Sequence, residues 1–155
     1  MEELIVKVDK DSYSMFDDMI FYRGNGRYKS EEELNAKQDF AGQYAILDKQ
    51  LLNAYAMQID DKFVGYICAA YIPKIGLPDN RNGYMYVDDL WVNPNYRRMG
   101  IAEKLMSKIE DIAKESGYYG LRLYVNTNND AGIALYEKCG YKNIYGTSML
   151  MERVL

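Results

Sequence analysis

One short segment of the sequence has the residue types that hold a phosphate group. Residues 96–102, which read YRRMGIA, follow a predicted strand and precede the apolar periodicity of a long helix. The first turn of a helix offers backbone N–H groups without intrahelical acceptors, together with the positive end of the helix dipole. Gly100 and Ala102 have little side chain where an anion would approach the backbone, and Arg97 and Arg98 add positive charge. The spacing differs from the GxGxxG dinucleotide motif and from the GxxxxGK(S/T) phosphate loop, so we expect neither a nicotinamide nucleotide nor ATP.

Composition limits the rest of the chemistry. The 155 residues contain no histidine, which excludes histidine-based triads and metal sites built on imidazole, so we expect no bound metal. Lys and Arg number 19 against 23 Asp and Glu, and this net charge of −4 argues against nucleic acid as the ligand. No apolar stretch approaches the ~20 residues of a membrane span. Because Cys68 and Cys139 form no CxxC motif and no signal-peptide pattern is present, we expect a cytoplasmic protein without membrane contact.

The order of the predicted elements indicates an α+β fold in a single domain that spans residues 1–155. A capping box at Ser30–Glu33 predicts one helix from Glu31 to the high forties. The other helices are expected at 13–23, 101–113 and 131–138. Strands are expected at 4–8, 54–59, 63–72, 84–92, 121–126, 141–145 and 149–154. The resulting order, β-α-α-β-β-β-α-β-α-β-β, predicts a mixed central sheet with helices on both faces.

Two motifs together resemble those of the GNAT N-acetyltransferases. The pattern R-x-x-G-x-A at 97–102, after a strand that ends in DDLWVNP, is similar to the coenzyme A motif of that family. The segment NDAGIALYEKCGY at 129–141 resembles the family pattern N-x-x-A-x-x-L-Y-E-K-x-G-F/Y. The motifs occur in the family's order, separated by a helix and a strand, and cover roughly 84–141. The resemblance implies a GNAT-like, mostly antiparallel sheet and acetyl-CoA as the cosubstrate.

The resemblance also assigns residues to the cofactor. The pantetheine arm would lie between two splayed strands and pair like an added strand with Leu90 and Val92, with Trp91 as a further contact. Asn129 matches the family asparagine that hydrogen-bonds the cofactor. The backbone of the loop would hold the coenzyme A pyrophosphate, and its residues are Arg97, Arg98, Met99, Gly100, Ile101 and Ala102.

The same resemblance gives catalytic candidates. Tyr136 matches the tyrosine that protonates or hydrogen-bonds the leaving thiolate, and an ordinary tyrosine pKa of ~10 suits that task. Asp88 and Asp89 can accept the amine proton, directly or through water, or hold a cationic amine, and Asp88 is the first choice for the base. Adjacent strand residues point to opposite faces, so at most one of them should face the site. Cys139 is expected to be a buried thiol rather than an acyl carrier, because no histidine can activate it.

The resemblance implies an N-acetyltransferase that transfers acetyl directly to a primary amine of a small molecule. Phe21–Tyr28, which is rich in aromatic residues, glycine and charge, is expected on the acceptor side. Tyr86–Val92 is especially similar to the diamine and polyamine acetyltransferase form of this strand, and an acidic chain suits a polycation. An aminoglycoside or a protein amino group stays open as the acceptor. A non-catalytic acetyl-CoA sensor or scaffold, which would not need Tyr136 or Asp88, also stays open. Because the family often pairs through its last strands, we expect a homodimer through Tyr141–Val154.

Overall fold

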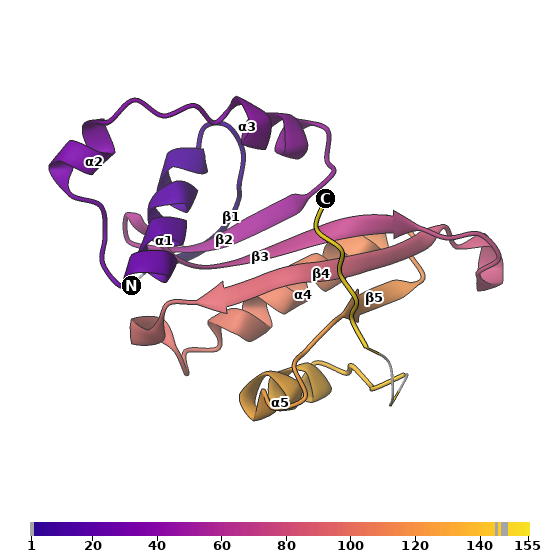
Figure 1. The fold of residues 1–155 in the computed structure, drawn as a ribbon. Helices are drawn as coiled ribbons and strands as arrows, with labels where there is room; N and C mark the ends of the chain where they lie inside the picture. The colour runs from indigo at the N-terminus through magenta and orange to yellow at the C-terminus, as the bar shows by residue number, and fades with distance from the viewer. Residues whose placement is uncertain (1, 145, 147–148) are drawn as a thin grey trace. The chain divides into compact units, whose positions relative to one another are not determined.

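The computed structural model describes residues 2–144, 146 and 149–155, and its elements are drawn in Figure 1. The described strands are β1 (Glu3–Lys7), β2 (Asn53–Ile59), β3 (Lys62–Pro73), β4 (Gly83–Val92) and β5 (Gly120–Leu123). The described helices are α1 (Tyr13–Asn25), α2 (Glu31–Asn35), α3 (Ala41–Asp48), α4 (Ile101–Glu115) and α5 (Asp130–Lys138). Short 3-10 turns at Pro78–Asn80 and Pro94–Tyr96 flank β4. The chain divides into two compact units, residues 1–124 and 125–155, and each is described by itself.

The strands of the first unit form one sheet in the order β1-β2-β3-β4-β5. Neighbouring strands run antiparallel except β4 and β5, which run parallel. A parallel pair needs a crossover connection, and α4 provides it between β4 and β5. The predicted α+β class and the mixed, mostly antiparallel sheet are therefore confirmed.

Helices of the first unit cover both faces of the sheet (Figure 1). The apolar face of α4 buries Ile101, Leu105 and Ile109 against strands β2 to β5. On the other face, α1 packs against β3 and contributes Phe16 and Met19 to an apolar cluster. Both helices follow the 3.6-residue apolar period of the sequence, which is why their existence could be predicted. Within the described ranges, no helix combines the length and the apolar character that a membrane crossing requires.

The predicted second helix is in fact two short helices, α2 and α3. Its capping box is present: the Ser30 hydroxyl accepts from the Glu33 amide at 3.2 Å, and the Glu33 carboxylate accepts from the Ser30 amide at 2.8 Å. The helix nevertheless stops before residues 36–40, where the Asp39 carboxylate accepts from the Ala41 amide at 3.0 Å and starts a new helix. α2 buries no side chain, so no core contact carries a helix through this mostly polar segment. The expectation of one continuous helix is therefore wrong.

The two predicted C-terminal strands are not formed by the described residues. Tyr141–Ile144 and residues 149–154 contain no strand, and Tyr145 lies outside the described residues. An apolar pattern makes a strand only when a neighbouring strand pairs with its backbone N–H and C=O groups. No described residue after β5 enters a sheet ladder, and the side chains of Met149, Leu150 and Met151 are 74–82% exposed. For the described part of this region the strand prediction is wrong.

Gly83 begins β4 at a point where a larger residue does not fit. Its φ is 155°, and an added Cβ would lie 2.3 Å from the carbonyl oxygen of Ile72. We therefore expect Gly83→Ala to lower the free energy of unfolding by about 2–4 kcal/mol in denaturant titrations. The matched control is Gly120→Ala on β5, because its Cβ would meet only the Tyr84 ring, at the ordinary contact distance of 3.6 Å. Equal losses of stability in the two variants would contradict this explanation.

Candidate functional site

The segment between β4 and α4 contains the turn that is predicted to bind an anion, which we call the anion-binding turn. The chain leaves β4, passes through the 3-10 turn at Pro94–Tyr96 and enters α4. Arg98 and Gly100 have left-handed backbone angles, with φ of 63° and 75°, and these curl the chain before the helix. The Lys104 amide donates to the Gly100 carbonyl at 3.1 Å, so the helical amides before Lys104 have no intrahelical acceptor. Backbone donors and the positive end of a 15-residue helix therefore occur together here.

The side chains of residues 97–102 leave room for a diphosphate. Arg97 and Arg98 are exposed, whereas Ile101 is buried and anchors the start of α4 in the core. No atom lies within 4 Å of the position that a Cβ would take on Gly100. The other two residues predicted to contact the cofactor in this turn, both half-buried, are Met99 and Ala102. The open backbone and the two cationic side chains suit the pyrophosphate of coenzyme A.

Asn93 fixes the start of this turn and was missed as a site residue in the sequence. It is 1% exposed, its amide donates to the Val64 carbonyl at 2.8 Å, and its side-chain oxygen accepts from the Asn95 amide at 3.0 Å. Its carbonyl also accepts from the Tyr96 amide at 2.8 Å. In the sequence, the run Asn93-Pro94-Asn95 indicates only that a strand ends there. A buried asparagine whose groups all find partners holds the turn in one conformation.

The half of β4 that leads into the turn has an open edge. β5 pairs with β4 only from Tyr84–Gly120 to Val87–Leu123, so in the described part of the chain residues 88–92 have no strand partner on that side. On the other side, Leu90, Trp91 and Val92 pair with β3, and all three are half-buried. Leu90–Val92 therefore present a strand edge without a strand partner among the described residues, and this edge runs directly into the anion-binding turn.

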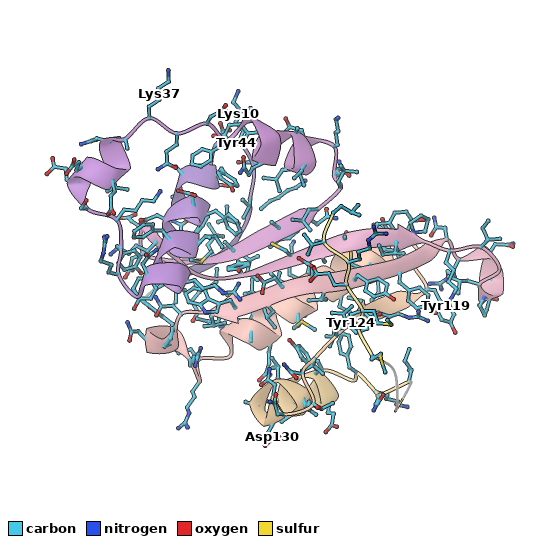
Figure 2. The ribbon with its side chains drawn as sticks, viewed as in Figure 1. Lys10, Lys37, Tyr44, Tyr119, Tyr124 and Asp130 are labelled. Atoms are coloured by element: carbon cyan, nitrogen blue, oxygen red, sulfur yellow. The ribbon has the colours of Figure 1, made fainter. Side chains whose placement is uncertain are left out.

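Aromatic contacts hold β5 to the first half of β4. Tyr119 and Tyr124 lie at the two ends of β5 (Figure 2). The Tyr119 ring meets the Tyr84 ring edge-on at 5.5 Å between centroids, and the Tyr124 ring stacks on Tyr86 at 6.3 Å. The guanidinium of Arg122 lies 3.8 Å from the centre of the Tyr84 ring. These contacts hold β5 to the part of β4 that it pairs with, which ends at Val87.

A β-bulge gives the two adjacent aspartates different environments. Cys68 pairs with Asp89 and Ala69 with Val87, so Asp88 is the extra residue of β4. Asp88 is exposed, and within the described residues its carboxylate makes no ion pair. Asp89 is half-buried and is bound by other side chains. Of the two candidate bases, the structure leaves the Asp88 carboxylate accessible.

Asp89 belongs to a network that the sequence does not reveal. Its Oδ2 accepts from the Tyr66 hydroxyl at 2.6 Å and from the Arg23 guanidinium at 2.5 Å, and Arg23 also donates to the Tyr66 oxygen. Burial and the neighbouring Asp89 carboxylate raise the pKa of Tyr66 well above its ordinary value, so Tyr66 remains a donor. Burial alone would lower the pKa of Arg23, but its hydrogen bonds to Asp89 and Tyr66 and its electrostatic interactions with both groups together outweigh burial and raise it. The sequence analysis named Asp89 as a candidate base and placed Arg23 in the predicted acceptor segment, but nothing in it connected the two residues or pointed to Tyr66.

Aromatic rings lie in contact with one another between the predicted acceptor segment and β4. The predicted acceptor segment, Phe21–Tyr28, lies at the end of α1 and in the loop that follows. The centre of the Tyr22 ring is 4.6 Å from that of Tyr28 and 6.4 Å from that of Trp91. The Trp91 ring is in turn 6.2 Å from Tyr66. Asp88 and Asp89 thus lie on the same strand as Trp91, whose ring belongs to this group of aromatic side chains. Carboxylates near aromatic rings can receive a cation.

The second unit contains the remaining predicted residues, on or beside α5. Asn129 is the N-cap of α5, where its side-chain oxygen accepts from the Gly132 amide at 3.0 Å, and Asp130 follows it (Figure 2). Tyr136 is half-buried on α5, and the centre of its ring lies 6.1 Å from that of Tyr141. Cys139 is half-buried rather than buried as expected. The capping bond occupies the oxygen of Asn129, so its amide nitrogen is the group that remains to donate to a ligand.

Comparison with known proteins relates this arrangement to a family. The model of the acetyltransferase (GNAT) family matches residues 14–141. A relative from Arabidopsis thaliana, GCN5-related N-acetyltransferase 4, chloroplastic, is 38% identical over 77 residues, which are 49% of this chain and 26% of that protein. Thialysine N-epsilon-acetyltransferase from Bos taurus is 31% identical over 118 residues, which are 74% of this chain and 66% of that protein. The chain thus spans between about a quarter and two thirds of the length of these relatives.

A solved structure shares the fold. AAC(6')-Iy, solved in complex with the bisubstrate analog CoA-S-monomethyl-acetylneamine, superposes with a TM-score of 0.76. The superposition covers 99% of this chain and 100% of that chain at 13% identity, so it shows the fold alone. The family match, in contrast, runs through both predicted motifs, the turn at 97–102 and the segment at 129–141. The chain therefore belongs to the acetyltransferase (GNAT) family.

Proposed function

We propose that the chain is an N-acetyltransferase that moves the acetyl group of acetyl-CoA directly to a primary amine of a small molecule. The observation that carries this proposal is the continuity of the anion-binding turn at 97–102 with the open edge of β4 at 88–92. A pyrophosphate on the turn lets the pantetheine arm extend along that edge. There the amides of the arm can pair with the backbone of Leu90 and Val92, as an added strand does, with Trp91 beside them.

The proposed reaction needs one proton acceptor and one proton donor. The nitrogen of a neutral amine attacks the thioester carbon, so a C–N bond forms, the C–S bond breaks and coenzyme A leaves as a thiolate. Asp88 receives the amine proton, directly or through water, since it is exposed and Asp89 is bound by Arg23 and Tyr66. Backbone N–H groups on the open edge of β4 stabilise the oxyanion. Tyr136 gives its proton to the thiolate, and Asn129 donates to the cofactor.

A turnover screen tests this proposal. Purified protein is mixed with acetyl-CoA and a panel of monoamines, polyamines, aminoglycosides, thialysine and a lysine-containing peptide, and the release of free thiol is followed. We expect acetylation of at least one small amine. Acetyl-CoA binding in a calorimeter without turnover of any amine would favour the non-catalytic sensor or scaffold. Acetylation of the peptide alone would indicate that the acceptor is a protein amino group rather than a small molecule.

Replacing Asp88 tests its role as the proton acceptor. Asp88→Asn keeps the shape of the side chain and removes its basicity, so kcat/KM for the preferred amine should fall by about a hundredfold. The calorimetric affinity for coenzyme A should remain within a factor of about two, because Asp88 precedes the strand segment proposed to bind the cofactor. Asp61→Asn, in the exposed turn between β2 and β3, is the matched control and should change neither quantity. Unchanged kcat/KM in Asp88→Asn would remove Asp88 from the mechanism.

We further propose that the chain forms one catalytic domain that pairs as a homodimer in the cytoplasm. The family match from 14 to 141 runs through both compact units, which supports a single domain. Met149, Leu150, Met151, Val154 and Leu155 all have exposed apolar side chains, and a partner chain could bury them. Sedimentation velocity over a range of concentrations tests the dimer, and a monomer at all concentrations would refute it.

A further inference from the structure

Arg23, Tyr66 and Asp89 form a closed triangle of hydrogen bonds next to Asp88, the proposed proton acceptor. A single carboxylate oxygen of Asp89 accepts from the guanidinium of Arg23 and from the hydroxyl of Tyr66. Arg23 comes from the last turn of α1, Tyr66 from β3 and Asp89 from β4. Side chains from three elements therefore meet at the Asp89 carboxylate. The positive charge of Arg23 neutralises this carboxylate before any substrate binds.

The charges of Asp88, Asp89 and Arg23 all affect the thiol of Cys68. Burial, followed by the negative charges of Asp89 and Asp88, raises the pKa of the Cys68 thiol to about 12, while the positive charge of Arg23 opposes that rise. Both carboxylates and the guanidinium are thus close enough to be felt by the same buried thiol. Two negative charges and one positive charge leave a net charge of −1, and the carboxylate that remains unpaired is that of Asp88.

The triangle keeps this charge balance at ordinary pH. Tyr66 is 2% exposed, and its raised pKa means that it stays protonated and continues to donate to Asp89. Arg23 stays charged, since arginine does not lose its proton in proteins. Its side chain is still 41% exposed, so its positive charge also faces any molecule that approaches Asp89. The aromatic ring of Tyr66 lies 5.8 Å from the guanidinium and helps to hold it there.

We propose that Arg23 determines the charge of the amine that the site accepts. By neutralising Asp89 it leaves one negative charge, which matches an acceptor with a single ammonium group. A second ammonium on the same molecule meets the guanidinium and is disfavoured, whereas a neutral or carboxylate end is tolerated. This inference rests on the proposed function and deepens it: the preferred class is small monoamines, including those with a carboxylate at the far end, rather than the diamines and polyamines that the strand motif resembles.

Three acceptors of equal length measure this selectivity. They are pentylamine, 1,5-diaminopentane and 5-aminopentanoate, which each have five carbon atoms and end in a neutral, a cationic and an anionic group. For each we would measure kcat/KM and, independently of turnover, the binding affinity by calorimetry in the presence of coenzyme A. In the wild-type protein we expect the diamine to be the poorest of the three. The preference should weaken with added salt, because the interacting charges are partly exposed.

Charge variants shift the diamine-to-monoamine ratio in opposite directions. Arg23→Gln leaves Asp89 unneutralised and should raise the ratio about tenfold, because a charge some 6 Å away is worth about that factor at a partly exposed site. Asp89→Asn leaves Arg23 unneutralised and should lower the ratio by a similar factor. Arg23→Lys keeps the charge and should behave as wild type, and the double variant Arg23→Gln with Asp89→Asn should return to the wild-type ratio.

The outcomes separate this inference from the proposed function. An unchanged ratio in both Arg23→Gln and Asp89→Asn would overturn it, as would an Arg23→Lys variant that behaves like Arg23→Gln. If calorimetry shows the opposite shifts but no amine is acetylated by any variant, the charge selection stands and the proposed function fails. If amines are acetylated with an unchanged ratio, the function stands and the role of Arg23 is refuted. Asp89→Asn keeps the test decisive if Arg23→Gln does not fold.

Discussion

A protein with Gly100→Glu is expected to bind coenzyme A about a thousandfold more weakly than the wild type. The new carboxylate would stand on the anion-binding turn, where repulsion from a diphosphate a few ångströms away costs about that factor near a protein surface. The substitution also places a side chain on a left-handed residue, whose φ is 75°, and distorts the turn. Isothermal titration with coenzyme A measures the loss directly, and it does not depend on knowing the acceptor.

Gly100→Ala separates the charge from the backbone effect. A Cβ at this position meets no atom within 4 Å, so alanine adds only the cost of the left-handed conformation. We expect its affinity for coenzyme A to fall by no more than about tenfold. If Gly100→Glu binds coenzyme A as well as Gly100→Ala does, the pyrophosphate does not lie on this turn, and the proposed cofactor site is wrong.

Tyr136→Phe should lower kcat for the preferred amine by about a thousandfold. The variant keeps the ring of Tyr136 in place and removes the hydroxyl that is proposed to protonate the thiolate, and general-acid catalysis is typically worth between a hundredfold and ten-thousandfold. Coenzyme A affinity should stay close to that of the wild type. Stopped-flow release of free thiol in a single turnover measures the chemical step without product release.

Tyr141→Phe is the matched control for Tyr136→Phe. The two rings are neighbours in the second unit, 6.1 Å apart, and each substitution removes one hydroxyl from the same region. Tyr141→Phe should keep kcat within a factor of about two to three. If both variants lose activity equally, the effect comes from the packing of α5, and Tyr136 is not the proton donor.

The elements that could be predicted from the sequence are those whose signals are local. α4 has apolar residues at the helical period over four turns, and the capping box of Ser30 and Glu33 needs only four consecutive residues. The break at residues 36–40 was not predictable in this way, because it reflects the absence of a core contact for α2. The prediction of strands from the apolar residues at the C-terminus was wrong for a similar reason. A strand depends on a partner strand that its own residues do not specify.

The same distinction between local signals and contacts distant in sequence applies to the candidate site. Residues 97–102 were identified because glycine, arginine and a following helix are contiguous in the sequence. Arg23, Tyr66 and Asp89 come from three separate elements, and only the sheet register and the placement of α1 bring them together. The bulge at Asp88 is also a property of register, so the different environments of the two aspartates could not be read from the pair Asp88-Asp89 itself.

The bulge at Asp88 has a consequence for the protein without its ligands. A strand whose backbone donors and acceptors are unsatisfied along one side is a template for aggregation with the sheets of other molecules. Natural sheets resist such association with bulges and with charged side chains that interrupt the flat ladder, and Asp88 supplies both at the point where β5 ends. We therefore expect the carboxylate that is proposed to receive a proton during catalysis also to discourage edge-to-edge association of the protein.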